Sequence, residues 1–329
     1  MMNDPFCWAF IGAGTLAKQV AKEITASGNH KIVCVYTRNP EKCAAFAAEY
    51  GALAAKSAEQ AISAPEVEGV YIVTPHTSHF AYAKLALELG KSVLCEKPVT
   101  TDAKQAAELA ALSQARGVYF AEAMWTWFSP IANQVKAWLD AGEYGQIRSM
   151  HANYRMNSIN YAPRVSDPNL AGGALLDVGI YPITYIYRLF GKPEKITCTG
   201  TLKDGIDLCE DVTLEYPGGK RYTASASIVD FKGLERVKLR GTKGSTNLFL
   251  FHMANKVSLR RGWRLPLRCK GYGGMRNEFD LVAREIREGL VQSRYVPHKA
   301  TIEVMQSLDE CRRQMGLVYP FEQEHEEKI

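Results

Sequence analysis

The sequence lacks the features of a membrane or secreted protein. No apolar run reaches the length of a membrane span, and the start, Met1-Met2-Asn3-Asp4-Pro5, has no basic region ahead of an apolar one. The eight cysteines include no Cys-x-x-Cys pair, and a chain of 329 residues needs no disulfides to stabilise its core. We therefore expect no membrane partner, no secretory signal, and free thiols in a reducing, cytoplasmic setting.

A strong excess of charge of one sign is also missing. The formal net charge of +5 is small for this length and fits an anionic ligand as well as nucleic acid. A basic patch interleaved with exposed aromatics, typical of nucleic-acid binding, is not found either. Apolar residues make up 47% and charged residues 23%, which is ordinary for a globular protein, and the length favours two domains. We expect a small-molecule partner and no nucleic acid.

What is present begins with a glycine-rich turn. The apolar run Phe6–Ile11 is typical of a strand buried on both faces, and it leads into Gly12-Ala13-Gly14-Thr15-Leu16-Ala17 and then a helical stretch. In Gly-x-Gly-x-x-Ala the first glycine allows a tight turn, and the second lets a pyrophosphate approach the backbone. A helix N-terminus attracts phosphates. The pattern predicts a dinucleotide site formed by Gly12, Gly14, Thr15 and Leu16.

The end of the second expected strand indicates which dinucleotide binds. An NAD site usually has an Asp or Glu there, but Lys31–Tyr36 is followed by Thr37-Arg38-Asn39-Pro40. Arg38 can pair with a 2′-phosphate and Thr37 can donate a hydrogen bond to it. We therefore expect NADP, with NAD less favoured. The alternative is that Arg38 is a solvated loop residue.

Polar residues follow another expected strand, Gly69–Val73. They are Thr74, Pro75, His76 and His79, and we assign them to the cofactor site. The spacing of His76 and His79 also permits a metal, but no third ligand is nearby, so we expect no metal site. Capping of the following helix is the other interpretation.

The strand Ser92–Cys95 runs directly into Glu96-Lys97-Pro98. Proline must end the strand, and a lysine at a strand's carboxyl end lies where open parallel sheets bind ligands. A surface lysine beside a turn is the alternative. Strands alternating with helices up to Val118–Ala121 predict an α/β Rossmann domain with a doubly wound parallel sheet at residues 1–122.

Residues 123–329 show a different pattern. Strand-like runs joined by short turns, such as Pro217-Gly218-Gly219, predict an α+β domain with a large, mainly antiparallel open sheet. Small and polar residues fill most positions of Arg221–Val229. We expect another subunit to cover one face of this sheet, giving a homodimer.

A second motif lies in this half of the chain, at Gly172-Gly173-Ala174-Leu175-Leu176-Asp177-Val178-Gly179-Ile180-Tyr181-Pro182. Asp177 and Tyr181 are four residues apart, so on a helix they share a face. A capping Asp and a core Tyr would give the same pattern.

Together, the glycine turn, Glu96-Lys97-Pro98 and Gly172-Gly173…Asp177…Tyr181 resemble the Gfo/Idh/MocA oxidoreductases over nearly the whole length. Within that family the chain is most similar to the branch of dimeric dihydrodiol dehydrogenases and NADP-dependent D-xylose dehydrogenases. Stretches such as Ala121-Glu122-Ala123-Met124-Trp125-Thr126 carry this closer resemblance. One departure is Trp127, where the branch usually has Arg, at an expected pocket wall.

The resemblance implies hydride transfer between a nicotinamide and a carbinol or carbonyl carbon. Lys97 would hydrogen-bond the reacting oxygen, Tyr181 would exchange its proton, and Asp177 would orient Lys97 or the substrate hydroxyls. Glu96 and Lys97 would also contact the cofactor. Trp125, Tyr154 and Tyr161 could form an aromatic wall that, with Asp177 and Tyr181, suits a sugar or a cyclic diol.

Two other functions fit the same fold: a non-catalytic NADP-binding sensor, and an NAD-dependent inositol or sugar dehydrogenase of the same family. Retention of Lys97, Asp177 and Tyr181 together favours an enzyme. Short-chain dehydrogenase chemistry needs Tyr-x-x-x-Lys on a helix, and the match from Tyr216 to Lys220 is a turn.

Overall fold

The computed structural model describes residues 4–160, 162–232 and 234–326. It divides into two compact units, Met1–Trp125 with Met275–Ile302, and Thr126–Gly274 with Glu303–Ile329. The segment Met275–Ile302 thus joins the first unit although it follows most of the second in sequence. Its helix α9 packs against α1 of the first unit.

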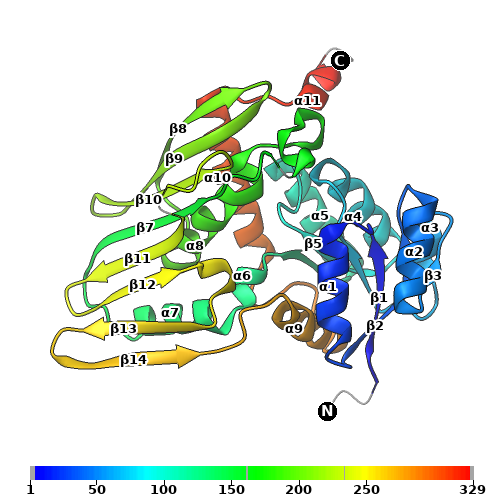
Figure 1. Ribbon diagram of the computed structural model, residues 1–329, viewed down its shortest axis with the longest axis horizontal. Coiled ribbons are helices and arrows are strands. Elements are labelled where there is room, and N and C mark those ends of the chain that lie inside the picture. Colours follow the sequence, from blue (N-terminus) through cyan, green and yellow to red (C-terminus); the bar gives the residue numbers. More distant parts are fainter. Residues whose placement is uncertain (1–3, 161, 233, 327–329) are drawn as a thin grey trace. The chain divides into compact units, whose positions relative to one another are not determined.

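A parallel six-stranded sheet forms the centre of the first unit, in the order β3-β2-β1-β4-β5-β6 (Figure 1). This order is the doubly wound arrangement of dinucleotide-binding folds, so the prediction of a Rossmann domain is confirmed. Its strands are β1 Phe6–Ile11, β2 His30–Tyr36, β3 Leu53–Ala54, β4 Gly69–Ile72, β5 Ser92–Glu96 and β6 Phe120–Ala123. Its helices are α1 Thr15–Thr25, α2 Pro40–Tyr50, α3 Ala58–Ser63, α4 His79–Glu88, α5 Ala103–Arg116 and α9 Arg276–Arg287.

Local sequence explains where these helices begin and end. Asn39 caps α2 by accepting from the Lys42 N–H at 2.9 Å, and Pro40 stands at the first helical position. Asp102 caps α5 in the same way, and Gly117 ends it in the left-handed conformation that glycine adopts without strain. α1 differs, because its N-terminal residue Gly14 supplies no side-chain cap. The first N–H groups of α1 therefore remain available to a ligand.

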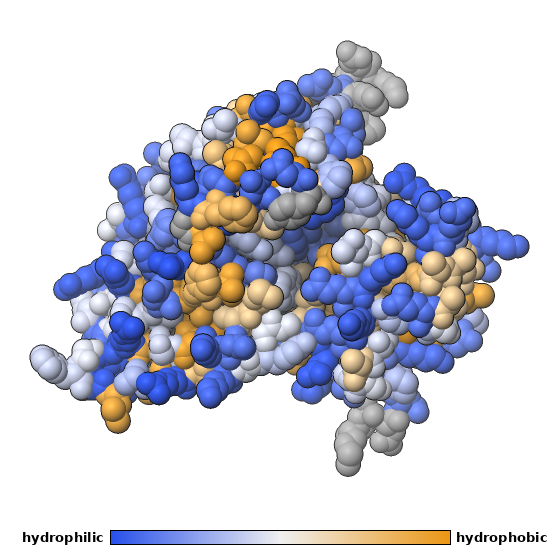
Figure 2. All heavy atoms as spheres, viewed as in Figure 1, coloured by the Kyte–Doolittle hydropathy of each residue, from blue (hydrophilic) through white to orange (hydrophobic). Residues whose placement is uncertain are grey.

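The second unit contains an eight-stranded sheet in the order β14-β13-β12-β11-β7-β10-β9-β8. Among the described strands of this sheet, only β7 and β10 pair in parallel, so the predicted mainly antiparallel sheet is confirmed. The strands are β7 Ile147–Arg155, β8 Lys195–Lys203, β9 Ile206–Tyr216, β10 Lys220–Ser227, β11 Glu235–Gly241, β12 Ser245–Phe249, β13 Lys256–Arg261 and β14 Arg264–Lys270. The remaining helices are α6 Trp125–Phe128, α7 Pro130–Asp140, α8 Ile180–Phe190, α10 His298–Met315 and α11 Pro320–Glu326. Figure 2 shows many hydrophilic residues, with smaller apolar patches between them, over the strands of this unit.

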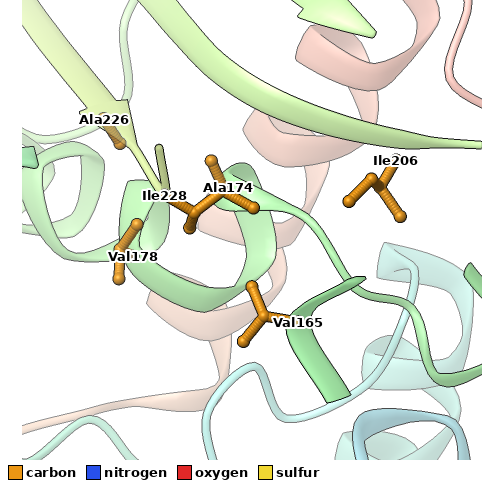
Figure 3. Packing of buried hydrophobic residues seen from close by; sticks show 6 residues of the cluster. All are labelled: Val165, Ala174, Val178, Ile206, Ala226 and Ile228. Carbon is orange, nitrogen blue, oxygen red and sulfur yellow. The ribbon is translucent and has the colours of Figure 1, made fainter. Parts of the chain in front are cut away.

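A π-helical turn, Leu175–Gly179, precedes α8 and rests on a buried apolar cluster (Figure 3). The cluster draws on three parts of the unit: the segment before the turn, the turn itself, and the strands β9 and β10 with the residue that follows β10. Its members are Val165, Ala174, Val178, Ile206, Ala226 and Ile228. Each buried Val or Ile contributes about 1.5–3 kcal/mol. The cluster therefore fixes the position of the turn and of the segment around Val165 together.

Two buried carboxylates brace the same turn. Asp207 Oδ2 accepts from the Leu175 N–H at 2.6 Å, and a Cβ on Gly173 or Gly179 would overlap the carboxyl of Asp207 or Glu210. Burial raises the pKa of Glu210 well above its usual range, and the adjacent Asp207 raises it further. Glycine at 173 and 179 lets both groups approach the backbone.

One expectation about membrane segments was wrong. The stretch Pro168–Phe190 is long and apolar enough to cross a membrane by length and composition, with a mean hydropathy of 1.2. However, 89% of the most apolar 18-residue window in this stretch is buried inside the protein. It forms the π-helical turn and α8, which are core elements of the second unit.

Candidate functional site

A cavity of about 190 Å³ opens at the carboxyl ends of β1, β2 and β4. It contains six of the residues predicted to bind the cofactor: Gly12, Gly14, Thr37, Arg38, Thr74 and Pro75. Ligands of open parallel sheets bind at this edge. Thr15 and Leu16 lie at the start of α1 just beyond the cavity lining, and both are exposed.

The two glycines of the turn are needed for different structural reasons. Gly12 has φ +118°, and a Cβ there would lie 2.5 Å from the carbonyl oxygen of Val73. Gly14 has an ordinary φ of −77°, and a Cβ there would meet no protein atom within 4 Å. Gly12 is therefore needed for folding, whereas the space beside Gly14 fits a pyrophosphate at the start of α1.

Among the lining residues that the sequence did not predict are Tyr36, Lys42 and Tyr82. Lys42 adds a second cation to Arg38, and both lie where the adenosine ribose would bind. Tyr36 and Tyr82 meet edge to face with centroids 6.4 Å apart. The position of Lys42, four residues after Arg38 in the first turn of α2, could have indicated it.

Lys97 follows the last residue of β5 and is half-buried, as the sequence placed it. The Lys97–Pro98 peptide bond is cis. The preceding carboxylate of Glu96 is buried, and it accepts from the Tyr71 hydroxyl at 2.6 Å and from the Lys97 N–H at 3.2 Å. Burial raises the pKa of the Tyr71 phenol, and Glu96 raises it further, so this hydroxyl stays a donor. Glu96 therefore anchors the backbone of Lys97 to the core.

The predicted residues His76 and His79 are both buried, with rings 5.8 Å apart. The ring nitrogens of His79 lie 2.9 Å from the Pro98 carbonyl oxygen and 2.8 Å from that of Thr74. His79 thus ties the chain after β4 to the chain after β5. Among the described residues, no group of three His, Cys, Asp or Glu side chains could hold a metal ion.

In the second unit, Asp177 lies in the π-helical turn and Tyr181 in the first turn of α8. Both are buried. Asp177 Oδ1 accepts from Arg164 at 2.7 Å, and the Arg164 side chain is 48% exposed. The sequence did not identify Arg164, because only the fold brings residues 164 and 177 together. The π-helical geometry was also missed, and such turns often mark functional sites.

An aromatic group surrounds Tyr181. Tyr154 of β7 lies 5.5 Å from it, and His252 stacks on Tyr154 at 5.1 Å with the ring planes 25° apart. Tyr154 and Tyr181, both predicted to bind substrate, are thus brought together. Tyr161 lies outside the described residues. Trp125, the third member of the predicted aromatic wall, begins α6 and is half-buried.

The placement of Trp127 at the pocket wall stays a prediction. Its side chain is buried, its ring stacks on Tyr187 at 6.1 Å, and Arg188 lies over it at 5.3 Å. Arg188 also donates to the Trp127 carbonyl oxygen at 2.5 Å and to Asn133. The guanidinium of Arg188, from α8, therefore lies against the Trp127 ring.

Comparison with known proteins defines the class. Residues 6–123 match the oxidoreductase family with an NAD-binding Rossmann fold, and residues 132–247 match the GFO/IDH/MocA C-terminal domain. The chain belongs to the Gfo/Idh/MocA family of oxidoreductases. Similar relatives include trans-1,2-dihydrobenzene-1,2-diol dehydrogenase from cattle (Bos taurus), 31% identical over 95% of this chain and 98% of the relative. D-xylose 1-dehydrogenase (NADP(+)) from Hypocrea jecorina is 29% identical over 95% of this chain and 93% of the relative.

Solved structures share the fold. A 3-ketoreductase from Actinomadura kijaniata, in complex with NADP and TDP-benzene, superposes with a TM-score of 0.84 over 95% of this chain and 98% of that one, at 21% identity. Aldose-aldose oxidoreductase from Caulobacter crescentus gives the same TM-score at 17% identity, over 94% of this chain and 97% of that one. The predicted fold class and family are confirmed, while the roles of individual site residues stay predictions.

The contrast between Gly12 and Gly14 gives a direct test of the cofactor site. Gly12→Ala should destabilise the protein by several kcal/mol, because it combines a strained φ with a backbone clash. Gly14→Ala should leave the melting temperature of the free protein nearly unchanged and weaken dinucleotide binding. Thermal unfolding and fluorescence titration with NADPH measure the two effects. A Gly14→Ala protein that binds NADPH like the wild type would place the pyrophosphate elsewhere.

Proposed function

We propose that the protein is an NADP-dependent dehydrogenase or reductase that transfers a hydride between the nicotinamide and a CH–OH or C=O carbon of a sugar or cyclic diol. Support comes from the family, from the names of the dihydrodiol and D-xylose relatives, and from the site residues. The observation that carries the proposal is Lys97, anchored by Glu96 at the ligand-binding edge of the first unit's sheet.

The nicotinamide supplies the hydride chemistry when bound. On reduction, the Lys97 ammonium donates a hydrogen bond to the substrate oxygen and stabilises the negative charge that develops there. Tyr181 gives its phenolic proton to that oxygen, and on oxidation it takes the proton back. Asp177, held by Arg164, accepts from a neighbouring substrate hydroxyl. Vicinal hydroxyls, which sugars and cyclic diols share, suit this arrangement.

Cofactor choice follows from the two cations beside the cavity. Arg38 and Lys42 can both pair with a 2′-phosphate, and no acid at the end of β2 competes for the ribose hydroxyls. NADP therefore binds in preference to NAD.

Replacing Arg38 tests this choice. Arg38→Ala should weaken NADP binding by about ten- to a hundredfold, because a charged hydrogen bond contributes about 1.5–3 kcal/mol, and should leave NAD binding nearly unchanged. Arg116→Ala, at the end of α5, is a matched control. Titration calorimetry with both dinucleotides provides the measurement. Equal losses of affinity for NADP and NAD would contradict the assignment of Arg38 to the 2′-phosphate.

Turnover tests the chemistry at Lys97 and Tyr181. Absorbance at 340 nm should report oxidation of a trans-dihydrodiol or an aldose with NADP by the wild type. Lys97→Met should lower kcat by on the order of a hundredfold or more, and Tyr181→Phe by about a hundred- to ten-thousandfold, with NADPH still bound. If both groups act on one oxygen, the double variant should be little slower than the slower single variant. NADPH binding without turnover of any diol, aldose or ketose would favour a sensor instead.

We also propose that the protein is a homodimer joined through the open face of the second unit's sheet. Alternate residues of β9 and β11 are buried, and those between them lie in cross-strand rows on the other face, where Asn153 of β7 and Ser225 of β10 are also buried. One row contains Asp211, Ser225, Asn153 and Arg236, so the acid lies on β9 and the cation on β11. A two-fold axis along the strands, between β7 and β10, would place β9 opposite β11 of the second subunit. Such a contact matches opposite charges.

Charge exchange on this face tests the dimer. Asp211→Lys and Arg236→Glu should each weaken the dimer, because each sets like charges against one another, and the double variant should restore it. Glu108→Lys, on α5, is the control that should stay dimeric. Sedimentation velocity at micromolar concentration provides the measurement. A wild-type monomer under those conditions would contradict the proposal.

The cellular setting is a related proposal. All eight cysteines are free thiols, including Cys198 and Cys311, which interact with each other. We propose that the protein works in a reducing compartment, the cytoplasm. We also predict that the protein binds neither a membrane nor nucleic acid.

A further inference from the structure

A carboxylate–imidazole pair lies beside Tyr181, and sequence motifs gave no sign of it. Glu235 begins β11 and His252 lies in the short 3₁₀ helix Phe251–Met253 that follows β12. The Glu235 side chain is 3% exposed and that of His252 is 16% exposed. Both belong to the second unit, as Tyr154 and Tyr181 do.

Both oxygens of Glu235 are used on this one residue. Oε1 accepts from the His252 backbone N–H at 2.6 Å, and Oε2 bonds Nδ1 of the His252 ring. A carboxylate can only accept, so Nδ1 carries the hydrogen and Nε2 points away from Glu235. The ring is therefore fixed in both tautomer and orientation.

The fixed ring contacts the predicted proton-transfer residue through one intermediate. His252 stacks on Tyr154 at 5.1 Å, and Tyr154 in turn packs on Tyr181 at 5.5 Å. The rings of His252 and Tyr181 themselves are 6.3 Å apart. Glu235 on β11 is paired in register with Tyr154 on β7. The sheet therefore holds the carboxylate of Glu235 and the ring of Tyr154 next to each other.

The surrounding backbone is strained to achieve this arrangement. Leu234 and Leu250 have φ values of 52° and 48°, a left-handed conformation uncommon for leucine. Leu234 directly precedes Glu235, and Leu250 donates its N–H to the Glu235 carbonyl oxygen at 3.0 Å. Strain of this kind concentrates at functional sites. A buried carboxylate with one partner is also a poor means of stabilising a fold.

We propose that Glu235 and His252 form a positioning pair that holds Tyr154 and, through it, the Tyr181 hydroxyl in its reactive orientation. The role of Tyr181 rests on the proposed function. The pair itself touches neither the cofactor nor the reacting carbon in this account. It acts as outer hydrogen-bond partners do when they orient a reacting side chain.

A mutant cycle separates positioning from simple stabilisation. Glu235→Gln keeps the shape and removes the charge, and His252→Phe keeps the stacking and removes the hydrogen bond. Each should lower kcat about ten- to a hundredfold with little change in KM, as losing an outer partner typically does. In a Tyr181→Phe background neither should lower kcat further. Asp280→Asn, which removes the charge of the partly exposed carboxylate paired with His30 in the first unit, is the control and should leave kcat unchanged.

A spectroscopic measurement decides the pairing independently of turnover. In histidine-labelled protein, the ring ¹⁵N signals of His252, assigned by their loss in His252→Phe, should shift on Tyr181→Phe, and those of His30 should not. An unmoved His252 signal, or equal kcat losses in the wild-type and Tyr181→Phe backgrounds, would overturn the proposal. If no substrate is turned over, the proposed function fails, and the His252 shift still confirms or refutes the contact with Tyr181.

Discussion

The close approach between the β1–α1 turn and the end of β4 is the constraint on which the first unit depends. A side chain at Gly12 would collide with the Val73 carbonyl oxygen, so the turn can form only around a glycine. Once formed, it exposes the uncapped start of α1 beside the open space at Gly14. The same sheet edge holds Arg38, Thr74 and Lys97, because the carboxyl ends of parallel strands meet there.

Buried polar groups perform a similar task in both units. Glu96 anchors the backbone at Lys97, and Asp207 holds the π-helical turn that carries Asp177. Each buried carboxylate accepts hydrogen bonds from nearby donors, which offsets the cost of removing charge from water. Such contacts add little to stability, but they fix the backbone from which Lys97 and Asp177 project.

The sequence predicted what local patterns encode and missed what the register brings together. The glycine turn, the alternation of strands and helices and the Pro217-Gly218-Gly219 hairpin all have short-range signals, and the structure contains each of them. Strand β14 was not predicted because Arg264–Lys270 mixes charged residues with a proline. The sequence did not identify Arg164, Glu235 and His252 as neighbours of the site, because no spacing in the chain connects them with Asp177 or Tyr181.

We propose that this chain moves a hydride between a nicotinamide and a substrate carbon while Lys97 and Tyr181 serve the oxygen. The most direct measurement uses NADPH with deuterium at both C4 positions of the nicotinamide and a ketose or cyclic hydroxyketone. Mass spectrometry of the alcohol product should show one deuterium, bound to the former carbonyl carbon, and none exchanged with water. Product that lacks the label, or deuterium that appears in the solvent, would contradict the account.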